Sequence, residues 1–414
     1  MIAAPMSGSG KTTVGRGLMA LLRQKGYVVQ PFKCGPDYID TKFHEVVCGR
    51  PSINLDTFMA TPTHVHELFM RYGKDADVCV LEGMMGLFDG YDRDKGSSSE
   101  IARILGVPVV LVVDAKSAAY SMAALLQGFI NFKRDVRIVG VIFNKVGSAR
   151  HFQMLQQVCE ESGVACLGYL PRDGALELGS RYLGLDFSEQ HTTAPLVTLL
   201  EEHVDWERLL QISALSPAVS TTHDENTLHK NGQSVLIARN AESFSFIYQE
   251  TIDKFSTVRF FDPQTEVPDF HGIDMLYLPG GYPEKHLEAL ARAEATREAI
   301  RRYAESGGKI FAECGGMMYL CRNIVSDNGT FPMCDVLPYS ISARRTDRQL
   351  SLGYRQFMLH GKEYRGHEFH YTQFIGEAPQ SAAQVYNAKG DPVCTPIIRY
   401  KNVLASYTHL YDIV

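Results

Sequence analysis

A phosphate-binding loop near the start of the chain constrains the fold more than any other feature. Residues 4–13, Ala-Pro-Met-Ser-Gly-Ser-Gly-Lys-Thr-Thr, separate a short apolar run from a helix-like stretch, Thr12–Lys25. Glycines at such a strand-to-helix junction let backbone N–H groups close around phosphate oxygens in front of a helix N-terminus. The loop therefore predicts a parallel α/β domain that binds a nucleotide.

The core of this loop assigns individual roles. We expect six consecutive residues to bind ATP: Gly8, Ser9, Gly10, Lys11, Thr12 and Thr13. Lys11 would reach the outer phosphates, and the Thr12 hydroxyl would ligate Mg²⁺. The generic pattern GxxxxGK[ST] has Gly where this chain has Pro5, so only the Gly-Ser-Gly-Lys-Thr-Thr core matches.

The rest of the first half alternates strand and helix patterns. Three short β-branched runs with little alternation are typical of strands buried on both faces of a parallel sheet: Val78–Leu81, Val107–Val113 and Ile138–Phe143. Helix-like stretches lie around them: Ser98–Leu105, Ser117–Phe132 and His151–Ser162. This alternation predicts an α/β fold with a parallel sheet.

Polar residues follow several of these strands, at the sheet edge where ligands bind in open α/β folds. Glu82 ends the first of the three runs, and Asp89 lies in a glycine-flanked loop nearby. We expect Glu82 to hold Mg²⁺ or its water. Asn144 ends the third run and is a candidate for contacting adenine, although capping of the next helix is an equal alternative.

A second acidic loop, residues 35–40 (Gly-Pro-Asp-Tyr-Ile-Asp), follows the expected second strand. Asp37 is a candidate for the Mg²⁺ site, together with Thr12 and Glu82. The alternative is that Asp37 and Asp40 are turn residues, because turns after Gly-Pro favour Asp.

The length of the chain and a change in its character predict two domains. The 414 residues exceed one ordinary domain. We expect a nucleotide-binding domain over 1–190, a polar interdomain connection over 191–232 and a second α/β domain over 233–414. The second domain begins with four expected strands: Ser234–Ala238, Thr257–Phe261, Met275–Leu278 and Lys309–Phe311.

The second half carries a candidate thiol nucleophile. Cys314 lies between an expected strand and the glycines Gly315 and Gly316, at a sharp strand-to-helix turn. We expect the helix N-terminus to lower the pKa of this thiol. His409 follows the apolar run 403–405 and is the expected base. The N–H groups of Gly281 and Gly315 would form an oxyanion hole.

Composition excludes other classes of function. The formal net charge is -6, with 41 Lys and Arg against 47 Asp and Glu, so there is no basic excess for nucleic acid. No apolar run approaches the roughly 20 residues of a membrane span, and the first residues lack a signal-peptide pattern. The nine cysteines show no CxxC pair. We therefore expect a cytoplasmic protein with reduced thiols, no nucleic-acid partner and no membrane partner.

A histidine-rich segment invites a zinc assignment. Residues 366–371, Gly-His-Glu-Phe-His-Tyr, are not HExxH. On a strand, His367 and His370 point to opposite faces, so they cannot share one ion. We therefore reject a zinc site.

Taken together, these motifs resemble the cobyrinate a,c-diamide synthase family. Seven segments match its pattern in chain order and span nearly the whole chain: residues 4–13, 35–40, 82–90, 278–283, 313–316, 365–371 and 405–409. The Pro5 departure is normal for this family.

The resemblance implies an N-terminal ATP-dependent synthetase domain, similar to dethiobiotin synthetase, and a C-terminal class I glutamine amidotransferase. Cys314 matches the family's nucleophile and His409 its base. Glu82 and Asp89 match acidic residues of the synthetase site, and Asp37 and Ile39 match positions linked with substrate handling.

The implied enzyme is a carbon–nitrogen ligase that uses glutamine as the amide donor. It would convert cobyrinate to the a,c-diamide through acyl phosphates, with ATP and Mg²⁺, in cobalamin biosynthesis. The residue two after His409 is Tyr411, so the His-x-Glu carboxylate of ordinary triad amidotransferases is absent. The group that orients the imidazole stays open, as does the oligomeric state, with a homodimer as one option.

Two alternatives remain. The same chemistry on hydrogenobyrinate or nickel-sirohydrochlorin would use the same motifs. A P-loop switch ATPase with a non-catalytic second domain is an alternative from another class, although such a switch needs no thiol. Cobyric acid synthase fits less well, because its phosphate loop and the following segments differ from residues 8–13 and 35–40.

Overall fold

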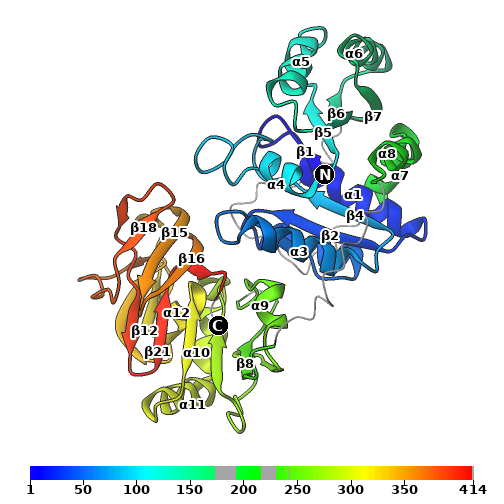
Figure 1. The fold of residues 1–414 in the computed structure, drawn as a ribbon. Helices are drawn as coiled ribbons and strands as arrows, with labels where there is room; N and C mark the ends of the chain where they lie inside the picture. Colours follow the sequence, from blue (N-terminus) through cyan, green and yellow to red (C-terminus); the bar gives the residue numbers. More distant parts are fainter. Residues whose placement is uncertain (173–192, 216–229, 242, 413–414) are drawn as a thin grey trace. The chain divides into compact units, whose positions relative to one another are not determined.

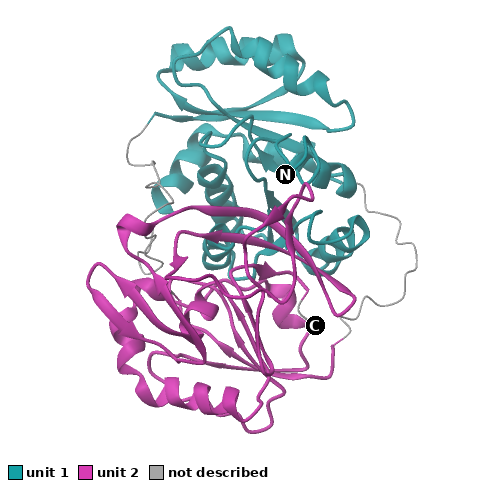
Figure 2. Cartoon of the chain, turned by 90° about the vertical axis from the view of Figure 1, so that its left-hand side faces the viewer, with its two compact units in different colours: residues 1–226 teal, residues 227–414 magenta. Residues whose placement is uncertain are grey.

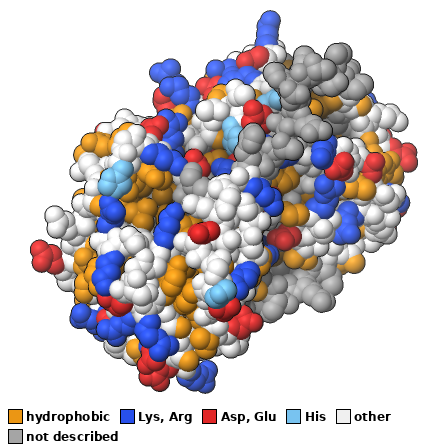
Figure 3. All heavy atoms as spheres, turned by 60° about the horizontal axis from the view of Figure 1, so that its bottom comes forward, with side chains coloured by type: hydrophobic (Ala, Val, Ile, Leu, Met, Phe, Trp, Pro, Cys, Tyr) orange, Lys and Arg blue, Asp and Glu red, His pale blue; other side chains and the backbone are white. Residues whose placement is uncertain are grey.

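The chain folds into two compact units, residues 1–226 and 227–414 (Figure 2). The computed structural model describes residues 1–172, 193–215, 230–241 and 243–412. On the face drawn in Figure 3, acidic and basic side chains are interspersed, as the small net charge predicts. Among the described residues, none of the helices combines the length and apolar character that crossing a membrane requires.

The first unit is built on a seven-stranded parallel sheet (Figure 1). Its strands, in chain order, are β1 (Ile2–Ala3), β2 (Val29–Cys34), β3 (Ile53–Leu55), β4 (Val78–Glu82), β5 (Val109–Asp114), β6 (Ile138–Val146) and β7 (Ala165–Pro171). The order across the sheet is β3-β2-β4-β1-β5-β6-β7. The order reverses beside β1, so the loops after β1 and β4 open at one crevice.

Helices connect these parallel strands. They are α1 (Lys11–Gln24), α2 (Ile39–Cys48), α3 (Pro62–Gly73), α4 (Ser98–Leu105), α5 (Met122–Phe132) and α6 (Ala149–Ser162). The expected α/β fold is thus confirmed. The expected start of α5 at Ser117 is wrong, because Ser117 has φ 60°, a left-handed conformation that cannot continue an α-helix.

Two more helices complete the first unit, α7 (Ala194–His203) and α8 (Trp206–Ser213). They fall within 191–232, which we expected to be a connection between domains. Instead, Leu196 and Leu200 of α7 and Leu209 of α8 are buried in the core cluster formed with α1 and the sheet. Their apolar faces therefore belong to the first unit, while 173–192 and 216–229 lie outside the described residues.

The second unit contains a six-stranded sheet in the order β20-β21-β11-β10-β8-β9. Its strands are β8 (Ser234–Ala238), β9 (Thr257–Phe261), β10 (Met275–Leu278), β11 (Ile310–Glu313), β20 (Ile398–Tyr400) and β21 (Val403–Ser406). All neighbours pair in parallel except β20 with β21. The helices of this unit are α9 (Gln249–Asp253), α10 (Leu287–Arg292), α11 (Glu294–Glu305) and α12 (Gly315–Leu320).

Two smaller sheets complete the second unit. The first has the order β13-β12-β14-β17, formed by β12 (Cys321–Ser326), β13 (Gly329–Pro332), β14 (Leu337–Ser342) and β17 (Gln373–Phe374). The second is antiparallel in the order β19-β18-β15-β16-β22, formed by β15 (Ser351–Leu359), β16 (Lys362–His370), β18 (Val385–Asn387), β19 (Pro392–Val393) and β22 (His409–Leu410). β22 thus ties the end of the chain to β16.

Candidate active sites

The phosphate loop follows β1, and its tight turn depends on one glycine. Gly10 caps α1 with φ 100°, and a Cβ there would lie 2.2 Å from Nδ2 of Asn144. That amide donates a hydrogen bond of 3.0 Å to the Ser9 carbonyl. The strand-edge residue Asn144 therefore holds the loop in shape. The cap of α6 is Ser148, so the alternative that Asn144 caps this helix is wrong.

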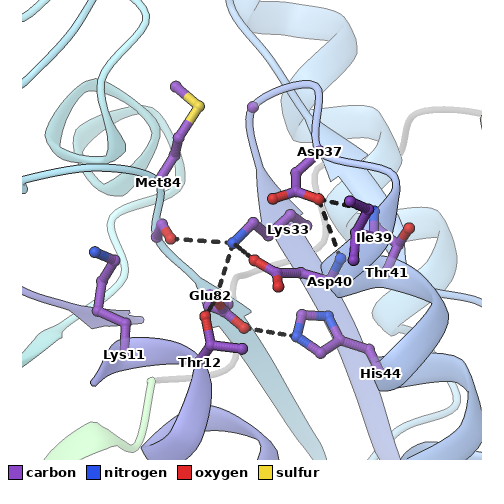
Figure 4. Close-up of polar contacts among 12 residues, drawn as sticks. Lys11, Thr12, Lys33, Asp37, Ile39, Asp40, Thr41, His44, Glu82 and Met84 are labelled. Carbon is purple, nitrogen blue, oxygen red and sulfur yellow. Dashed lines mark hydrogen bonds and ion pairs between the residues drawn. The ribbon is translucent and has the colours of Figure 1, made fainter. Parts of the chain in front are cut away.

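The side chains of Lys11 and Thr12 connect this loop to residues at and just after the end of β4. Nζ of Lys11 donates to the Met85 carbonyl at 2.5 Å. The Thr12 hydroxyl donates to Oε1 of Glu82 at 2.6 Å (Figure 4). The register of the sheet explains this meeting, because Ile2 of β1 pairs with Glu82 of β4.

Glu82 lies at the centre of a buried polar cluster (Figure 4). Nζ of Lys33 lies 2.8 Å from Oε1 of Glu82 and 2.5 Å from Oδ2 of Asp40. Nε2 of His44 lies 2.7 Å from Oε2 of Glu82, and the other ring nitrogen lies 3.0 Å from the Ser52 hydroxyl. Glu82 is fully buried, so these partners replace the water it has lost.

The charges in this cluster stabilise one another. Burial alone would raise the pKa of Glu82, but the charge of Lys33 and the hydrogen bond from His44 lower it well below its usual value. Burial alone would lower the pKa of Lys33, but Asp40 and Glu82 raise it. The cluster is therefore a preformed set of charged groups beside the phosphate loop.

The other residues expected at the synthetase site make local contacts. Oδ1 of Asp37 accepts from the N–H groups of Ile39 and Asp40 at 2.8 and 3.1 Å, so Asp37 does shape the turn before α2. Oδ2 of Asp89 accepts from the Gly86 N–H at 3.0 Å. The part of Asp37, Ile39 and Asp89 in substrate handling stays a prediction.

An open hollow of about 280 Å³ lies after β5 and β6. Its lining includes the basic side chains Lys116, Lys145 and Arg172. Lys145 follows Asn144 directly, so the hollow lies at the same edge of the sheet as Asn144.

The second candidate site is the strand-to-helix turn at Cys314. This residue has φ 44° and ψ -109° between β11 and α12, a conformation that is rare for any residue except glycine. Its N–H donates to the Ser406 carbonyl at 2.7 Å, which ties the turn to the end of β21. The side chain is buried, with 5% exposed, and Sγ lies 4.0 Å from the Phe369 carbonyl.

Glycines crowd this turn so closely that side chains would not fit. A Cβ added at Gly280 would lie 2.1 Å from Cε1 of His409, and one added at Gly281 would lie 2.1 Å from the Ser243 carbonyl oxygen. At Gly315 the added Cβ would lie 2.7 Å from Pro283, and at Gly316 it would lie 2.0 Å from the Leu278 carbonyl oxygen. Gly281 also has φ 153°. The Gly315 N–H is hydrogen-bonded to the Cys314 thiol. Our assignment of Gly281 and Gly315 to an oxyanion hole stays a prediction.

His409 is held close to the same turn. It begins β22 and is paired with His367 of β16, and its ring lies against Gly280. Burial, followed by the charges of His367 and His370, lowers the pKa of His409 to about 3. The ring is therefore neutral at pH 7 and able to accept a proton.

The expected lowering of the Cys314 pKa is wrong. Burial and the nearby Glu284 raise this pKa above its usual value, and the Gly315 N–H only partly opposes them. The α12 helix has six residues, which leaves little dipole to stabilise a thiolate. The two shifts leave both groups uncharged at neutral pH, a thiol at Cys314 and an imidazole at His409.

A buried carboxylate on β16 supports this region. Glu368 accepts from the Ser351 and Thr395 hydroxyls, from Nε of Arg355 at 2.9 Å and from Nε2 of His370 at 2.9 Å. The His370 ring is stacked on Tyr407 with 3.6 Å between centroids. This network belongs to the histidine-rich segment and fixes the strand beside the 406–409 turn.

We predict that Glu368→Gln destabilises the second unit at neutral pH. Burial alone would raise the pKa of Glu368, but the hydrogen bond from His370 and the charge of Arg355 lower it from 4.5 to about 2. The stabilisation, at most about 3 kcal/mol, is present above pH 4.5 and is lost as the pH falls through 2. Denaturant unfolding between pH 7 and 3 should therefore give a difference from wild type that shrinks with falling pH.

The exposed Glu363 on the same strand supplies the control for this measurement. Glu363→Gln should change the free energy of unfolding by less than about 0.5 kcal/mol. A Glu368→Gln difference that stayed constant over the whole pH range would contradict the assignment of the low pKa to this carboxyl.

Sequence reasoning missed Lys33 and His44 in the first site, and Glu313 and Glu368 in the second. Lys33 offered a signal, because a charged residue inside a buried strand needs a buried partner. His44 lies four residues after Asp40 and shares its helix face, but nothing in the sequence pointed that face toward Glu82. The contacts of these side chains can be identified only once the register of the sheet is known.

Comparisons with known proteins match a family model to each half of the chain. Residues 1–184 match the family model described as the CobQ/CobB/MinD/ParA nucleotide binding domain. Residues 240–412 match the model described as the CobB/CobQ-like glutamine amidotransferase domain. The fold and the two matched domains thus define a protein with a nucleotide-binding domain followed by a glutamine amidotransferase domain.

Curated relatives identify the family within this class. Hydrogenobyrinate a,c-diamide synthase of Brucella abortus biovar 1 (strain 9-941) is 38% identical over 429 residues, covering 100% of this chain and 98% of the relative. Cobyrinate a,c-diamide synthase of Listeria monocytogenes serotype 4b (strain F2365) is 38% identical over 437 residues, covering 99% and 95%. The chain belongs to the family of cobyrinate and hydrogenobyrinate a,c-diamide synthases.

Solved structures give only distant matches. Cell division protein FtsY of Thermotoga maritima has a TM-score of 0.32 at 18% identity and covers 41% of this chain and 60% of its own. A glutamine amidotransferase has a TM-score of 0.24 at 24% identity and covers 34% of this chain and 71% of its own.

Proposed function

We propose that this chain amidates the a and c acetate carboxylates of cobyrinate, using ATP and glutamine, in cobalamin biosynthesis. The observation that carries the proposal is the end-to-end match to relatives named for this reaction. Hydrogenobyrinate is the second candidate, because a relative named for that substrate matches equally well, also at 38% identity.

The second unit would release ammonia from glutamine. Sγ of Cys314 attacks the side-chain amide carbon while the thiol proton passes to His409. The C–N bond then breaks, His409 returns the proton to the leaving ammonia, and a thioester remains. Water, activated by His409, hydrolyses the thioester to glutamate. The N–H groups of Gly281 and Gly315 would stabilise the oxyanion. In comparable sites, each such donor raises kcat by ~10²–10³-fold.

The first unit would activate the carboxylate. A carboxylate oxygen of the substrate attacks the γ-phosphorus of ATP, ADP leaves, and an acyl phosphate forms. Ammonia then attacks the acyl carbon, and phosphate departs to leave the amide. Lys11 would offset the negative charge of the transferring phosphoryl group, and the loop amides would orient the phosphates. Lys33 would keep Glu82 and Asp40 fixed beside them.

The residues at the end of β4 suit Mg²⁺ as the companion of ATP. The Thr12 hydroxyl and the Glu82 carboxylate are 2.6 Å apart and supply the hard oxygen ligands that Mg²⁺ prefers. In the parts of the chain that the structure describes, no group of three His, Cys, Asp or Glu residues could hold a metal by itself. Mg²⁺ usually needs only one or two protein ligands plus phosphates and water. When bound, it would neutralise phosphate charge.

We also propose a cytoplasmic location. All nine cysteines are free, with Cys394 exposed, and reduced thiols are normal in that compartment.

Mass spectrometry of a macrocycle incubated with the protein, ATP, Mg²⁺ and glutamine tests the function. Cobyrinate, hydrogenobyrinate and nickel-sirohydrochlorin are compared in parallel. We expect two carboxylate-to-amide conversions on cobyrinate, none without ATP. If no macrocycle is amidated while glutamine is hydrolysed, the proposed substrate class falls and the amidotransferase reaction stands.

A further inference from the structure

The residue before the nucleophile, Glu313, is a buried carboxyl at the end of β11 that contacts two other strands. It is 1% exposed. Its Oε1 accepts from the Leu410 N–H of β22 at 2.6 Å. Its Oε2 accepts from the Tyr277 hydroxyl of β10 at 2.6 Å. One side chain at the end of β11, directly before Cys314, therefore contacts the strand that begins with His409.

The same carboxyl faces the imidazole. Nδ1 of His409 lies 3.9 Å from Oε2 of Glu313. The ring packs against Gly280, where a Cβ would lie 2.1 Å from Cε1. The contact between Glu313 and the Leu410 N–H fixes the backbone next to His409. Nδ1 is thus directed toward a carboxyl at a distance that a small shift closes.

We propose that Glu313 is the positioning residue for His409, in place of the His-x-Glu carboxylate that the sequence lacks at Tyr411. This inference rests on the proposed glutaminase reaction. During attack the proton moves from Sγ of Cys314 to the imidazole and then to the departing ammonia. Throughout the reaction, Glu313 lies beside Nδ1 of the ring, holds the orientation of the ring and stabilises the transient imidazolium. Glu313 itself neither gains nor loses a proton over the cycle.

The environment of Glu313 suits this role. Burial raises its pKa to about 8, while the Tyr277 hydroxyl and the Leu410 N–H act in the opposite direction. Both neighbours donate to the carboxyl, so they stabilise the carboxylate that forms as the pH rises through 8. An imidazolium at His409 would add a third stabilising partner, which would make the interaction stronger in the transition state than in the resting site.

Glu313→Gln, assayed at pH 8.5 where a carboxyl with a pKa of about 8 is ionised, tests the proposal, because glutamine keeps the size of the side chain and cannot ionise. We expect kcat for glutamine hydrolysis to fall by about 10² or more, with KM for glutamine changed less than about threefold. Ammonia-dependent amidation should stay at the wild-type level, since the first unit is unchanged. In ¹⁵N NMR spectra, the His409 imidazole should change its tautomer balance, with the signal assigned from a His409→Gln variant.

Tyr277→Phe is the matched control. It removes a donor from the same oxygen of Glu313 but keeps the carboxyl, so kcat should fall less than about fivefold. Thermal unfolding of both variants shows whether they are folded. Glutaminase activity of Glu313→Gln within threefold of wild type would overturn the proposal. So would equal losses in both variants with an unchanged His409 signal, because Glu313 would then only brace the strands.

The assay separates this inference from the proposed function. Glutamine hydrolysis is measured without a macrocycle, so a wrong macrocycle does not affect the comparison. A wild-type protein that hydrolyses no glutamine under any condition would overturn both.

Discussion

Replacing Cys314 with alanine should abolish glutamine-dependent amidation and leave ammonia-dependent amidation intact. The thiol is the group that would form the thioester, and removal of a nucleophile costs at least about 10³-fold in comparable enzymes. The first unit has its own sheet and core, so its ATP-dependent step should continue when ammonia is supplied. Product formation measured with glutamine and with ammonium salt at raised pH, where more free ammonia is present, distinguishes the two reactions.

Cys394→Ala is the control for this variant, because Cys394 is an exposed free thiol of the same unit. It should retain both activities. Full glutamine-dependent activity of Cys314→Ala would contradict the assignment of Cys314 as the nucleophile. Loss of the ammonia-dependent activity as well would contradict the assignment of Cys314 to glutamine chemistry alone.

Replacing Lys11 with alanine should give the reverse pattern. Amidation should fall by about 10²–10³-fold or more with either nitrogen source, because the cation that offsets phosphoryl charge is lost. Glutamine hydrolysis should persist, since Cys314 and His409 are unchanged. Product formation and glutamate release, measured in the same samples, give the two rates.

A matched lysine replacement lies in the same unit. Lys95 has 63% of its side chain exposed and pairs with Asp92 at the surface, so Lys95→Ala should leave both rates unchanged. If Lys11→Ala amidated at the wild-type rate, residues 8–13 would not be the ATP site. Together, the Cys314 and Lys11 variants assign each half-reaction to one unit.

Local sequence patterns predicted those helices and strands for which the secondary-structure propensity of the residues agrees with the pattern of buried side chains. The predicted bounds of Ser98–Leu105, Ser234–Ala238 and Met275–Leu278 agree with α4, β8 and β10 to the residue. These segments combine a uniform pattern with turn residues at their ends. The first turn of α5 was predicted wrongly, because the left-handed Ser117 is not visible in residue type.

Partners that depend on register could not be predicted in the same way. The sequence placed Glu82 at a strand end, but its contact with Lys33 depends on the pairing of β2 with β4. It also placed Cys314 and His409 near strand ends, 95 positions apart. The pKa values of these two groups depend on their burial, which the pattern of strands and glycines does not report. The expected thiolate was wrong for this reason.

The glycines around Cys314 restrict how this enzyme can be altered by directed evolution. At Gly280, Gly281, Gly315 and Gly316, a single added carbon would meet backbone or ring atoms at 2.0–2.7 Å. A library randomised at these four codons should therefore return glycine at each position among active clones. Variants that accept a different nitrogen donor must therefore carry substitutions at positions other than these four glycines. The set of residues worth randomising is smaller than the set that lies near the thiol.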